Sequence, residues 1–270
     1  MLTDSEFNRI VTYVKKFCGI DLSKKRVLVK GRLESYILRN GYGSFDEYMN
    51  KVEHEGKGSG EAEKLINVLT TNHTYFMRES IHFEYMTKVV LPYLQRKEAA
   101  RKDLRIWSGA SSTGEEPYTI AMNLMEYFGL QKSSWDTRVL ATDISTQVLE
   151  HAVRGVYLKE DVAPLPEKWK RRFFRSISAD ECMVTDELKA QLFFRKFNLM
   201  DPLPFRKKFH IVFLRNVMIY FEDDVKYRLV SKIYDHMEPG GYFFIGTTES
   251  LDKEKTQFQY VQPSIYRKRE

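Results

Sequence analysis

The chain has 270 residues, of which 43% are hydrophobic and 30% are charged. These values exclude a largely disordered chain, and at roughly 100 to 200 residues per domain the length favours two domains or one large one. Cys18 and Cys182 are the only cysteines, which excludes a disulfide framework and a thiolate metal cage.

The formal net charge of +6 permits RNA, an anionic membrane surface or an acidic protein as partner. No run approaches the roughly 18 to 20 apolar residues of a membrane span, and the N-terminus lacks the basic-then-apolar form of a signal peptide. We therefore expect a cytoplasmic protein.

Residues 1–85 carry helical patterns and predict an all-α N-terminal domain, followed by a linker to about residue 95. Apolar residues at helical spacing follow a capping Thr3 or Asp4, and Gly19 ends this helix. Further expected elements are a short helix capped by Ser44, a glycine-rich mobile loop over 54–60 and a helix over 62–69.

Basic residues are concentrated in one part of this domain. Between Lys15 and Arg39 the chain has eight basic and two acidic residues, so this segment alone carries as much charge as the whole net charge. An apolar stripe with Leu28 and Leu33 predicts that it is helical. The basic residues form either a solvated helix face or a docking surface for an acidic protein.

After about residue 86, strand patterns alternate with helix patterns, which predicts an α/β fold with a doubly wound, mainly parallel sheet and helices on both faces. Residues 173–197 break the alternation and predict a small antiparallel β subdomain. Strands are expected over 104–108, 138–142, 210–214 and 242–245, helices over 115–128, 145–153 and 222–237, the last closed by Pro239-Gly240-Gly241, and a hairpin over 259–267.

A glycine loop follows the first of these strands. Gly109 and Gly114 bracket it, and glycine at the carboxyl end of a first strand is typical of a nucleotide or nucleoside site. The spacing gives neither a dinucleotide fingerprint nor a phosphate loop. Glu115 and Glu116 would repel a phosphate and attract a cation, so a positively charged cofactor is favoured. The alternative is a tight turn without a ligand.

Asp143 ends the next predicted strand. A carboxylate at this position can accept hydrogen bonds from both ribose hydroxyls of an adenosine group. The alternative is that Asp143 caps the helix that begins at Ser145.

Five segments in the same order resemble the chemotaxis receptor glutamate O-methyltransferases, and the resemblance covers nearly the whole chain. They are TNHTYFMRE at 71–79, the stretch 107–118 with GEEPY, ATDIS at 141–145, FNL at 197–199 and RNVMIYF at 215–221. The resemblance implies the methyltransferase fold and S-adenosylmethionine (SAM) as cofactor, with S-adenosylhomocysteine as product. It also implies methylation of glutamate side chains on cytoplasmic helices of chemoreceptors.

Residue roles follow from the same motifs. The resemblance implies that Arg78 and Tyr220 face the reacting centre and that Gly109 lets the cofactor approach. The residues expected around the cofactor are Asn72, Thr74, Arg78, Glu115, Asp143, Asn198, Leu199, Arg215 and Asn216. His73 stands where the family often has glutamate, and Met77 where it often has an aromatic residue.

Other interpretations of these residues stay open when each is considered alone. Asn72 and Thr74 could be caps, Asn198 and Asn216 turn residues, and Tyr220 a core tyrosine. The six histidines show no metal-binding spacing, and no metal is assigned.

A glutamate with an ordinary pKa of about 4.3 is already an anion at neutral pH and needs no general base. Orientation then matters most, and Arg78 could hold the carboxylate while Tyr220 donates a second hydrogen bond.

Residues 1–85 are the expected receptor-docking domain, and 86–270 the SAM-binding domain that contains the β subdomain over 173–197. The resemblance places receptor contact on the basic segment, with Lys24, Lys25, Arg26, Lys30 and Arg32 as the contacts. We expect a monomer that does not bind nucleic acid, does not insert directly into a membrane and acts without docking a receptor peptide.

Two other classes of protein remain as alternatives. An RNA or small-molecule methyltransferase would share the cofactor domain but should offer a base-stacking or substrate pocket. A binding module that senses SAM would keep Gly109, Glu115 and Asp143 and dispense with Arg78 and Tyr220.

Overall fold

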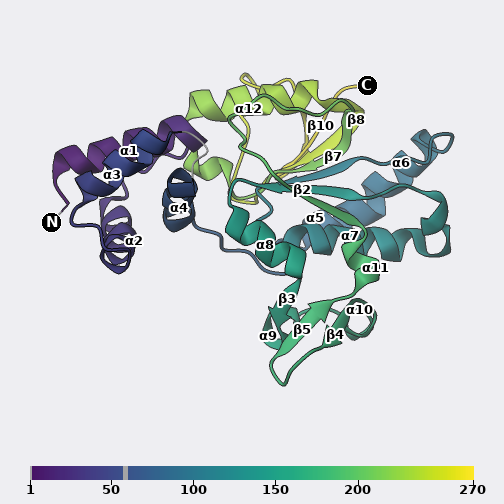
Figure 1. Ribbon diagram of the computed structural model, residues 1–270. Coiled ribbons are helices and arrows are strands. Elements are labelled where there is room, and N and C mark those ends of the chain that lie inside the picture. Colours follow the sequence, from purple (N-terminus) through teal and green to yellow (C-terminus); the bar gives the residue numbers. More distant parts are fainter. Residues whose placement is uncertain (1, 57–59) are drawn as a thin grey trace.

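The structure is a computed structural model that describes residues 2–56 and 60–270. It consists of a helical domain, a domain built on a central sheet, and a small β subdomain that projects from the second domain (Figure 1). Of the mobile loop expected over 54–60, residues 57–59 lie outside the described residues, whereas His54 and Glu55 belong to the third helix and Gly60 begins the fourth, so at these positions the prediction of a loop is wrong. None of the described helices is long and apolar enough to cross a membrane.

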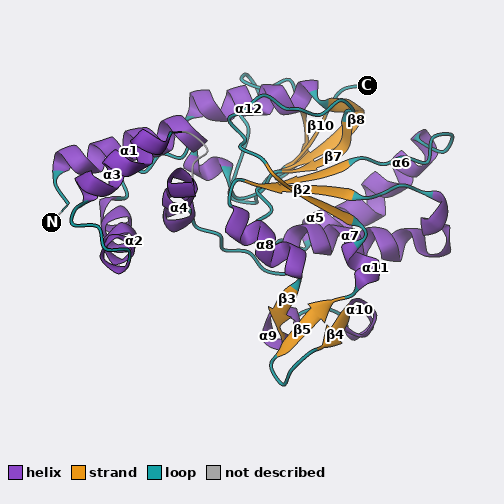
Figure 2. Cartoon of the chain, in the orientation of Figure 1, coloured by secondary structure: helices purple, strands orange, loops and turns teal. Residues whose placement is uncertain are grey.

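In the part of the helical domain that the structure describes, four helices pack around one apolar core, and Figure 2 shows that this domain is built of helices. They are α1 (Asp4–Cys18), α2 (Arg26–Arg39), α3 (Phe45–Glu55) and α4 (Gly60–Leu69). Thr3 and Glu6 form the capping box of α1, and Gly19 ends it with a φ of 78°, a value that glycine adopts without strain. The Ser44 hydroxyl accepts a hydrogen bond from the backbone N–H of Glu47 and caps α3.

The boundary between the two domains lies earlier than the sequence predicts. The core of the helical domain ends at Leu69, whereas Phe76 and Phe83 already belong to the core of the sheet domain. The segment from α5 (Ile81–Tyr85) through the π-helical turn η1 (Met86–Val90) to α6 (Leu91–Lys97) packs on the sheet. It is therefore a layer of the second domain, where the sequence predicts the end of the first domain and a linker.

The central sheet has seven strands in the order β6-β2-β1-β7-β8-β10-β9. The first five are parallel, and β10 pairs antiparallel with both β8 and β9. Their bounds are β1 (Ile106–Gly109), β2 (Val139–Asp143), β6 (Leu192–Lys196), β7 (Phe209–Phe213), β8 (Met237–Phe244), β9 (Gln259–Gln262) and β10 (Ile265–Arg267). The mainly parallel doubly wound sheet and the closing hairpin are thus confirmed.

Helices cover both faces of this sheet (Figure 2). On one face, α7 (Glu115–Phe128) joins α5, η1 and α6 in a core with alternate strand residues such as Ile106 and Ile211. On the other face, α12 (Asp223–Asp235) packs against Trp107 and Val212. Since the strands are buried on both faces, they read as continuous apolar runs. Helix α8 (Thr146–Arg154) and the short turns η2 (Gly129–Ser134) and η3 (Met218–Tyr220) complete the domain.

The β subdomain is an antiparallel sheet in the order β3-β5-β4. Its elements are β3 (Val156–Leu158), α9 (Lys159–Val162), α10 (Glu167–Phe173), β4 (Phe174–Ser176), β5 (Glu181–Val184) and α11 (Asp186–Lys189). The prediction that Leu192 to Phe194 belong to it is wrong, because β6 pairs in parallel with β2 at the edge of the main sheet. The subdomain also begins earlier than residue 173, since β3 pairs with β5.

Helix α12 also ends earlier than predicted. It stops at Asp235, and Pro239, Gly240 and Gly241 lie inside β8, where the pairing with β7 shifts register. Gly240 has a φ of 75°, which fits a bulge in a strand. Its backbone N–H donates to the carbonyl of Lys268, so the segment is paired as sheet. Proline and glycine here mark a bulge, although the same residues commonly end helices.

Candidate functional site

A cleft of about 290 Å³ lies where the carboxyl ends of β1, β2 and β7 face the helical domain. In sheets of this type, ligands bind at the edge where the strand order reverses, which here is between β1 and β7. The lining from the sheet domain includes Ala110, Ser111, Ser112, Glu116, Asp143, Ile144, Arg215, Asn216, Val217 and Tyr220. The lining from the helical domain and the segment after it includes Ile20, Asp21, Leu22, Lys25, Leu28, Leu69 and residues 70–75.

The structure brings most of the expected site residues together in this cleft. Those that line it are Asn72, Thr74, Arg78, Asp143, Arg215, Asn216 and Tyr220. Gly109, Glu115, Asn198 and Leu199 do not line it. Lys25, expected only in receptor contact, does.

Asp143 is buried at the end of β2. One carboxylate oxygen accepts a hydrogen bond from the backbone N–H of Ser112 at 2.9 Å, and the other accepts from that of Ser145 at 3.0 Å. Burial raises the pKa of Asp143, while these backbone donors act in the opposite direction. The capping alternative does not hold in its simple form, because Ser145 is the residue that caps α8.

The loop between β1 and α7 lines the cleft, but its two glycines, Gly109 and Gly114, do not take part in the lining. Ala110 and Ser112 have φ values of 56° and 50°, and the Ser112 hydroxyl donates to the carbonyl of Asn72 at 3.0 Å. A Cβ on Gly109 would lie 2.9 Å from Cδ1 of Leu214. Gly109 therefore fits close packing between strands.

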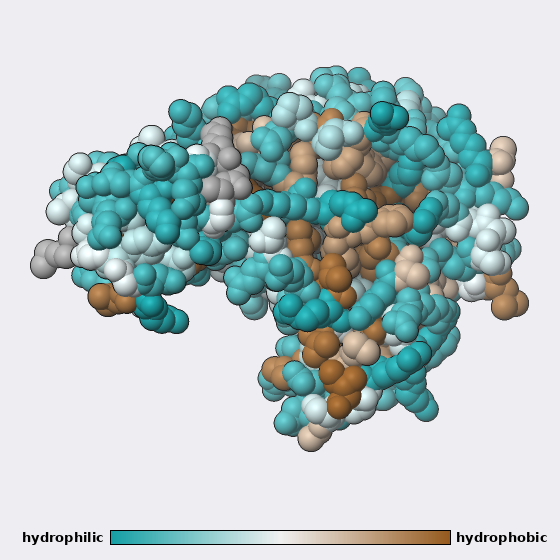
Figure 3. All heavy atoms as spheres, viewed as in Figure 1, coloured by the Kyte–Doolittle hydropathy of each residue, from teal (hydrophilic) through white to brown (hydrophobic). Residues whose placement is uncertain are grey.

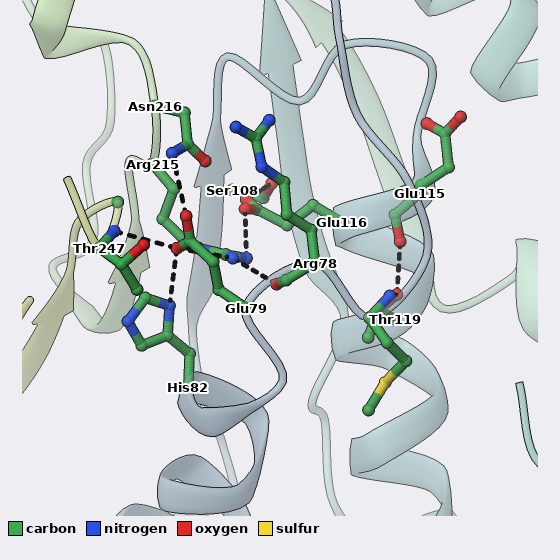
Figure 4. Close-up of polar contacts among 12 residues, drawn as sticks. Arg78, Glu79, His82, Ser108, Glu115, Glu116, Thr119, Arg215, Asn216 and Thr247 are labelled. Atoms are coloured by element: carbon green, nitrogen blue, oxygen red, sulfur yellow. Dashed lines mark hydrogen bonds and ion pairs between the residues drawn. The ribbon is translucent and has the colours of Figure 1, made fainter. Parts of the chain in front are cut away.

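The two glutamates at the start of α7 point in different directions (Figure 4). Glu115 accepts a hydrogen bond from the Thr113 hydroxyl and lies outside the cleft. Glu116 lines the cleft and accepts from the Ser108 hydroxyl at 2.7 Å. Burial raises the pKa of Glu116, and the charge of Arg215 opposes that rise.

Arg215 lies between two carboxylates, and its side chain is only 1% exposed. Its guanidinium is 3.0 Å from an oxygen of Glu79 and 3.0 Å from an oxygen of Glu116, and it also donates to the carbonyl of Arg78. A guanidinium has five N–H groups, and these contacts occupy four of them. Arg215 therefore has at most one donor left for a ligand.

Arg78 and Tyr220 reach the cleft from segments far apart in the sequence. Arg78 donates to the carbonyl of His73 at 2.6 Å, and its guanidinium lies 5.8 Å from the ring centre of Tyr75. The backbone carbonyl of Tyr220 accepts from the N–H of Asp21 at 2.8 Å. This bond ties the helical domain to the rim of the cleft, so Tyr220 has a structural contact in addition to its place in the lining.

Asn198 and Leu199 support the site from outside the lining. The Asn198 side chain donates to the carbonyl of Phe17 at 2.7 Å, and Leu199 is part of the core beneath α12. Asn198 thus joins the end of α1 to the sheet domain.

The five basic residues expected to contact a receptor have different environments. Arg26 donates to the carbonyl of Leu2 and pairs with Asp4. Arg32 donates to the carbonyls of Leu69 and Thr70 at 2.9 and 2.8 Å, at the end of α4. Among the described residues, the side chains of Lys24, Lys25 and Lys30 have no hydrogen-bond or ion-pair partner, so they are the three that are available to another molecule.

Sequence reasoning missed the cleft-lining role of Glu116 and the contacts of Glu79. Both residues lie in motifs that the sequence displays, but neighbouring glutamates on a helix start cannot be told apart by spacing alone. The segment 20–22 was also missed, because its contact with Tyr220 joins distant parts of the chain.

The donor set fits a cofactor with a ribose and a positive charge. Asp143 offers carboxylate oxygens at the sheet edge, and Glu116 offers another at the floor of the same cleft. Within residues 2–56 and 60–270, no group of three or more His, Cys, Asp or Glu side chains is arranged to hold a metal ion.

Comparison with known proteins identifies the family of both domains. Residues 5–70 match the family described as CheR methyltransferase, all-alpha domain, and residues 72–267 match CheR methyltransferase, SAM binding domain. The chain is 38% identical to a chemotaxis protein methyltransferase of Borreliella burgdorferi, over 99% of this chain and 95% of that relative. It is 34% identical to chemotaxis protein methyltransferase 2 of Pseudomonas aeruginosa, over 98% and 93% of the two chains.

A similar match covers 98% of this chain and 91% of the chemotaxis protein methyltransferase of Escherichia coli K12, at 34% identity. These matches confirm the resemblance, the fold class and the SAM cofactor that the sequence predicts. The chain therefore belongs to the CheR methyltransferase family, as a SAM-dependent methyltransferase of chemotaxis.

Proposed function

We propose that this protein transfers the methyl group of SAM to glutamate side chains on the cytoplasmic helices of chemoreceptors, giving glutamate methyl esters and S-adenosylhomocysteine. The observation that carries the proposal is that Arg78, Tyr220 and Lys25 line the same cleft as Asp143 and Glu116. Two cations and a phenol suit an anionic acceptor, and two carboxylates suit a cationic cofactor. The named activity of its relatives supports the same reading.

Asp143 would hold the ribose, and Glu116, in place of the predicted Glu115, would hold the ammonium group of the methionyl part. Asn72, Thr74 and Asn216 would complete the binding surface, since all three line the cleft. When bound, SAM supplies an electrophilic methyl group on a sulfonium. The walls of the cleft would be held in shape from behind by Gly109, Asn198 and Leu199.

The acceptor glutamate needs orientation more than activation. Its carboxylate is ionised at neutral pH, with an ordinary pKa of about 4.3. Arg78 has N–H groups beyond the one that bonds to His73, so it can hold the carboxylate while Tyr220 donates a hydroxyl. Holding the reacting groups in line contributes up to about 7 to 11 kcal/mol in well-oriented systems. Too tight a grip on the carboxylate would oppose the reaction, because its charge is neutralised in the transition state.

The receptor would approach along the helical domain. Considering only residues 2–56 and 60–270, the basic side chains of α2 and the turn before it that have no partner are those of Lys24, Lys25 and Lys30, and Lys25 also lines the cleft. Acidic receptor helices would be drawn to this surface by long-range attraction. The surface also has an apolar part at the ends of α2, where Val27 is 88% and Leu38 is 73% exposed, and brown atoms are visible over the lower tip of this domain (Figure 3).

An assay with radiolabelled SAM tests the proposal against both alternatives. The protein is incubated with receptor cytoplasmic fragments or with RNA. We expect label in the receptor fragment and none in RNA. Label in RNA would show a nucleic-acid methyltransferase. Binding of SAM without transfer to either acceptor would show a sensing module or a methyltransferase of small molecules, and either result would overturn the proposal.

A further inference from the structure

We propose that Glu79 is a positioning residue that holds Arg215 and Asn216 in the shape that receives SAM. Glu79 does not line the cleft, but both residues that it contacts do. The inference rests on the proposed function, because it concerns how the same site binds its cofactor.

The Glu79 carboxylate joins three segments of the chain (Figure 4). One oxygen accepts from Nδ2 of Asn216 at 3.0 Å. The other accepts from Nη2 of Arg215 at 3.0 Å and from the backbone N–H of Thr247 at 3.1 Å. The loops after β7 and β8 are therefore fixed to the segment that carries Arg78, which precedes Glu79 in the chain.

The backbone around this carboxylate is held in unusual conformations. Glu79 and Asn216 have φ values of 56° and 57°, in the left-handed region that residues with a Cβ seldom occupy. Such conformations persist where surrounding contacts impose them. The side-chain bond between Glu79 and Asn216, and the bond from the Asn216 N–H to Glu249 at 2.9 Å, are contacts of that kind.

Glu79 is ionised in the folded protein. Burial acts to raise its pKa, but hydrogen bonds from Asn216 and Arg215 and the charge of Arg215 outweigh burial, and the pKa is lowered. Because the folded pKa lies below the unfolded one, these contacts stabilise the fold above the unfolded pKa, and this stability is lost as the pH falls through the folded pKa. At neutral pH, Glu79 therefore contributes a full negative charge beside the cleft.

The Glu79 carboxylate also faces the ring of His82, which is fully buried. Nδ1 of His82 lies 3.5 Å from the Glu79 oxygen, and Nε2 lies 2.6 Å from the Ser264 hydroxyl. Burial and the charge of Arg215 lower the pKa of His82 to about 4, so the ring is neutral and does not cancel the charge of Glu79. The ring and Ser264 limit how far the carboxylate can move away from Arg215.

These contacts predict two separable effects. The geometry of Arg215 and Asn216 should affect SAM and S-adenosylhomocysteine alike, because both share the adenosine and methionyl parts. The charge of Glu79 should affect SAM more, because only SAM carries the sulfonium cation.

Calorimetric titration of SAM and of S-adenosylhomocysteine into three variants separates the effects. Glu79→Gln keeps the size of the side chain and removes its charge, whereas Glu79→Asp keeps the charge and shortens the reach. Glu98→Gln is the matched control. Glu98 is also buried and lies 3.5 Å from His210 and 3.7 Å from Arg101, but it is outside the cleft lining.

We expect Glu79→Gln to weaken SAM binding about tenfold or more, with a smaller loss for S-adenosylhomocysteine. Glu79→Asp should weaken both by a similar factor, and Glu98→Gln should lower the melting temperature without changing either Kd. If Glu79→Gln does not fold, Glu79→Asp carries the test. Unchanged affinities in the Glu79 variants that fold, or equal losses in Glu79→Gln and Glu98→Gln, would overturn the inference. A wild-type protein that does not bind SAM would instead overturn the proposed function.

Discussion

The carboxylate of Asp143 has two roles at the end of β2. It accepts from the backbone N–H groups of Ser112 and Ser145, so it shapes the loop after β1 as well as offering oxygens to the cleft. Both roles follow from the end of a parallel strand, where backbone donors and ligands meet at one edge.

Replacing Asp143 with asparagine should weaken SAM binding by about 2 kcal/mol, because hydrogen bonds to a charged acceptor are lost. The measurement is isothermal calorimetry. Asp136→Asn is the control, since Asp136 lies before β2 at the opposite edge of the sheet and pairs with Arg138. An unchanged affinity in Asp143→Asn would remove Asp143 from the site.

The raised pKa of Glu116 predicts that SAM binding depends on pH. Burial raises its pKa, so Glu116 gains a proton at a higher pH than an exposed glutamate does. The protonated form has no charge with which to attract an ammonium group. SAM affinity should therefore fall as the pH is lowered from neutral, and in Glu116→Gln it should be weaker throughout and less dependent on pH.

Glu115→Gln is the control for this prediction, because burial also raises the pKa of Glu115 although it lies outside the cleft. Its pH profile should match that of the wild type. If Glu115→Gln flattens the profile and Glu116→Gln does not, the two assignments must be exchanged.

At this scale the sequence identified polar residues that follow strands, such as Asp143 and Asn216, and the motif residues Asn72 and Arg78, all of which line the cleft. It could not distinguish Glu115 from Glu116, since adjacent residues at the start of a helix differ only in direction. The sequence also could not predict that most N–H groups of the Arg215 guanidinium donate hydrogen bonds to Glu79 and Glu116. Those pairs form only when distant segments of the chain meet in the fold.

At the scale of helices and strands, the sequence predicts the bounds of a helix well where residues typical of a helix start and a helix end are both present. The bounds of α7 are those expected, with Pro117 in its first turn and Gly129 after its last residue. The errors have physical causes. Pro239-Gly240-Gly241 forms a strand bulge, and Leu192 to Phe194 could pair in either sheet until the register with β2 is known.

Arg32 connects two elements and yields a prediction about stability. It donates to the last carbonyl of α4, that of Leu69, and to the carbonyl of Thr70, so Arg32→Ala removes a hydrogen-bond donor from the end of this helix. We expect a loss of about 1 to 3 kcal/mol in the free energy of unfolding, measured by denaturant titration.

Lys30→Ala serves as the comparison, since Lys30 lies on the same helix without a partner among the described residues. Its effect should stay within about 0.5 kcal/mol. Equal effects in the two variants would show that the hydrogen bonds of Arg32 do not stabilise the fold and that its side chain is available to another molecule.

At the scale of the whole molecule, the basic charge is concentrated in one segment of the helical domain. The segment from Lys15 to Arg39 carries eight of the basic residues. Among the described residues, the side chains of Lys24, Lys25 and Lys30 have no partner, and Lys25 lines the cleft. Exposed charges of this kind steer association and are screened by salt, with a Debye length of about 8 Å at physiological ionic strength.

Reversing Lys24 and Lys30 to glutamate should raise the KM for receptor fragments and flatten its dependence on salt, while the Kd for SAM stays unchanged. Arg206 and Lys208 provide the control, because they are exposed in the loop before β7, at the edge of the sheet away from the cleft. Reversal of that pair should leave the KM as it is. A KM that responds equally to both double variants would mean that net charge alone, and not this surface, governs association.

The most direct test of the central claim is the chemical identity of the transferred methyl group. Receptor fragments labelled by the wild-type protein are digested, and the methylated peptides are sequenced by mass spectrometry before and after mild alkali. We expect the methyl group on glutamate side chains, and we expect alkali to remove it as methanol, because esters hydrolyse under these conditions. Methylation that resists alkali, or that lies on nitrogen or on a residue other than glutamate, would contradict the account.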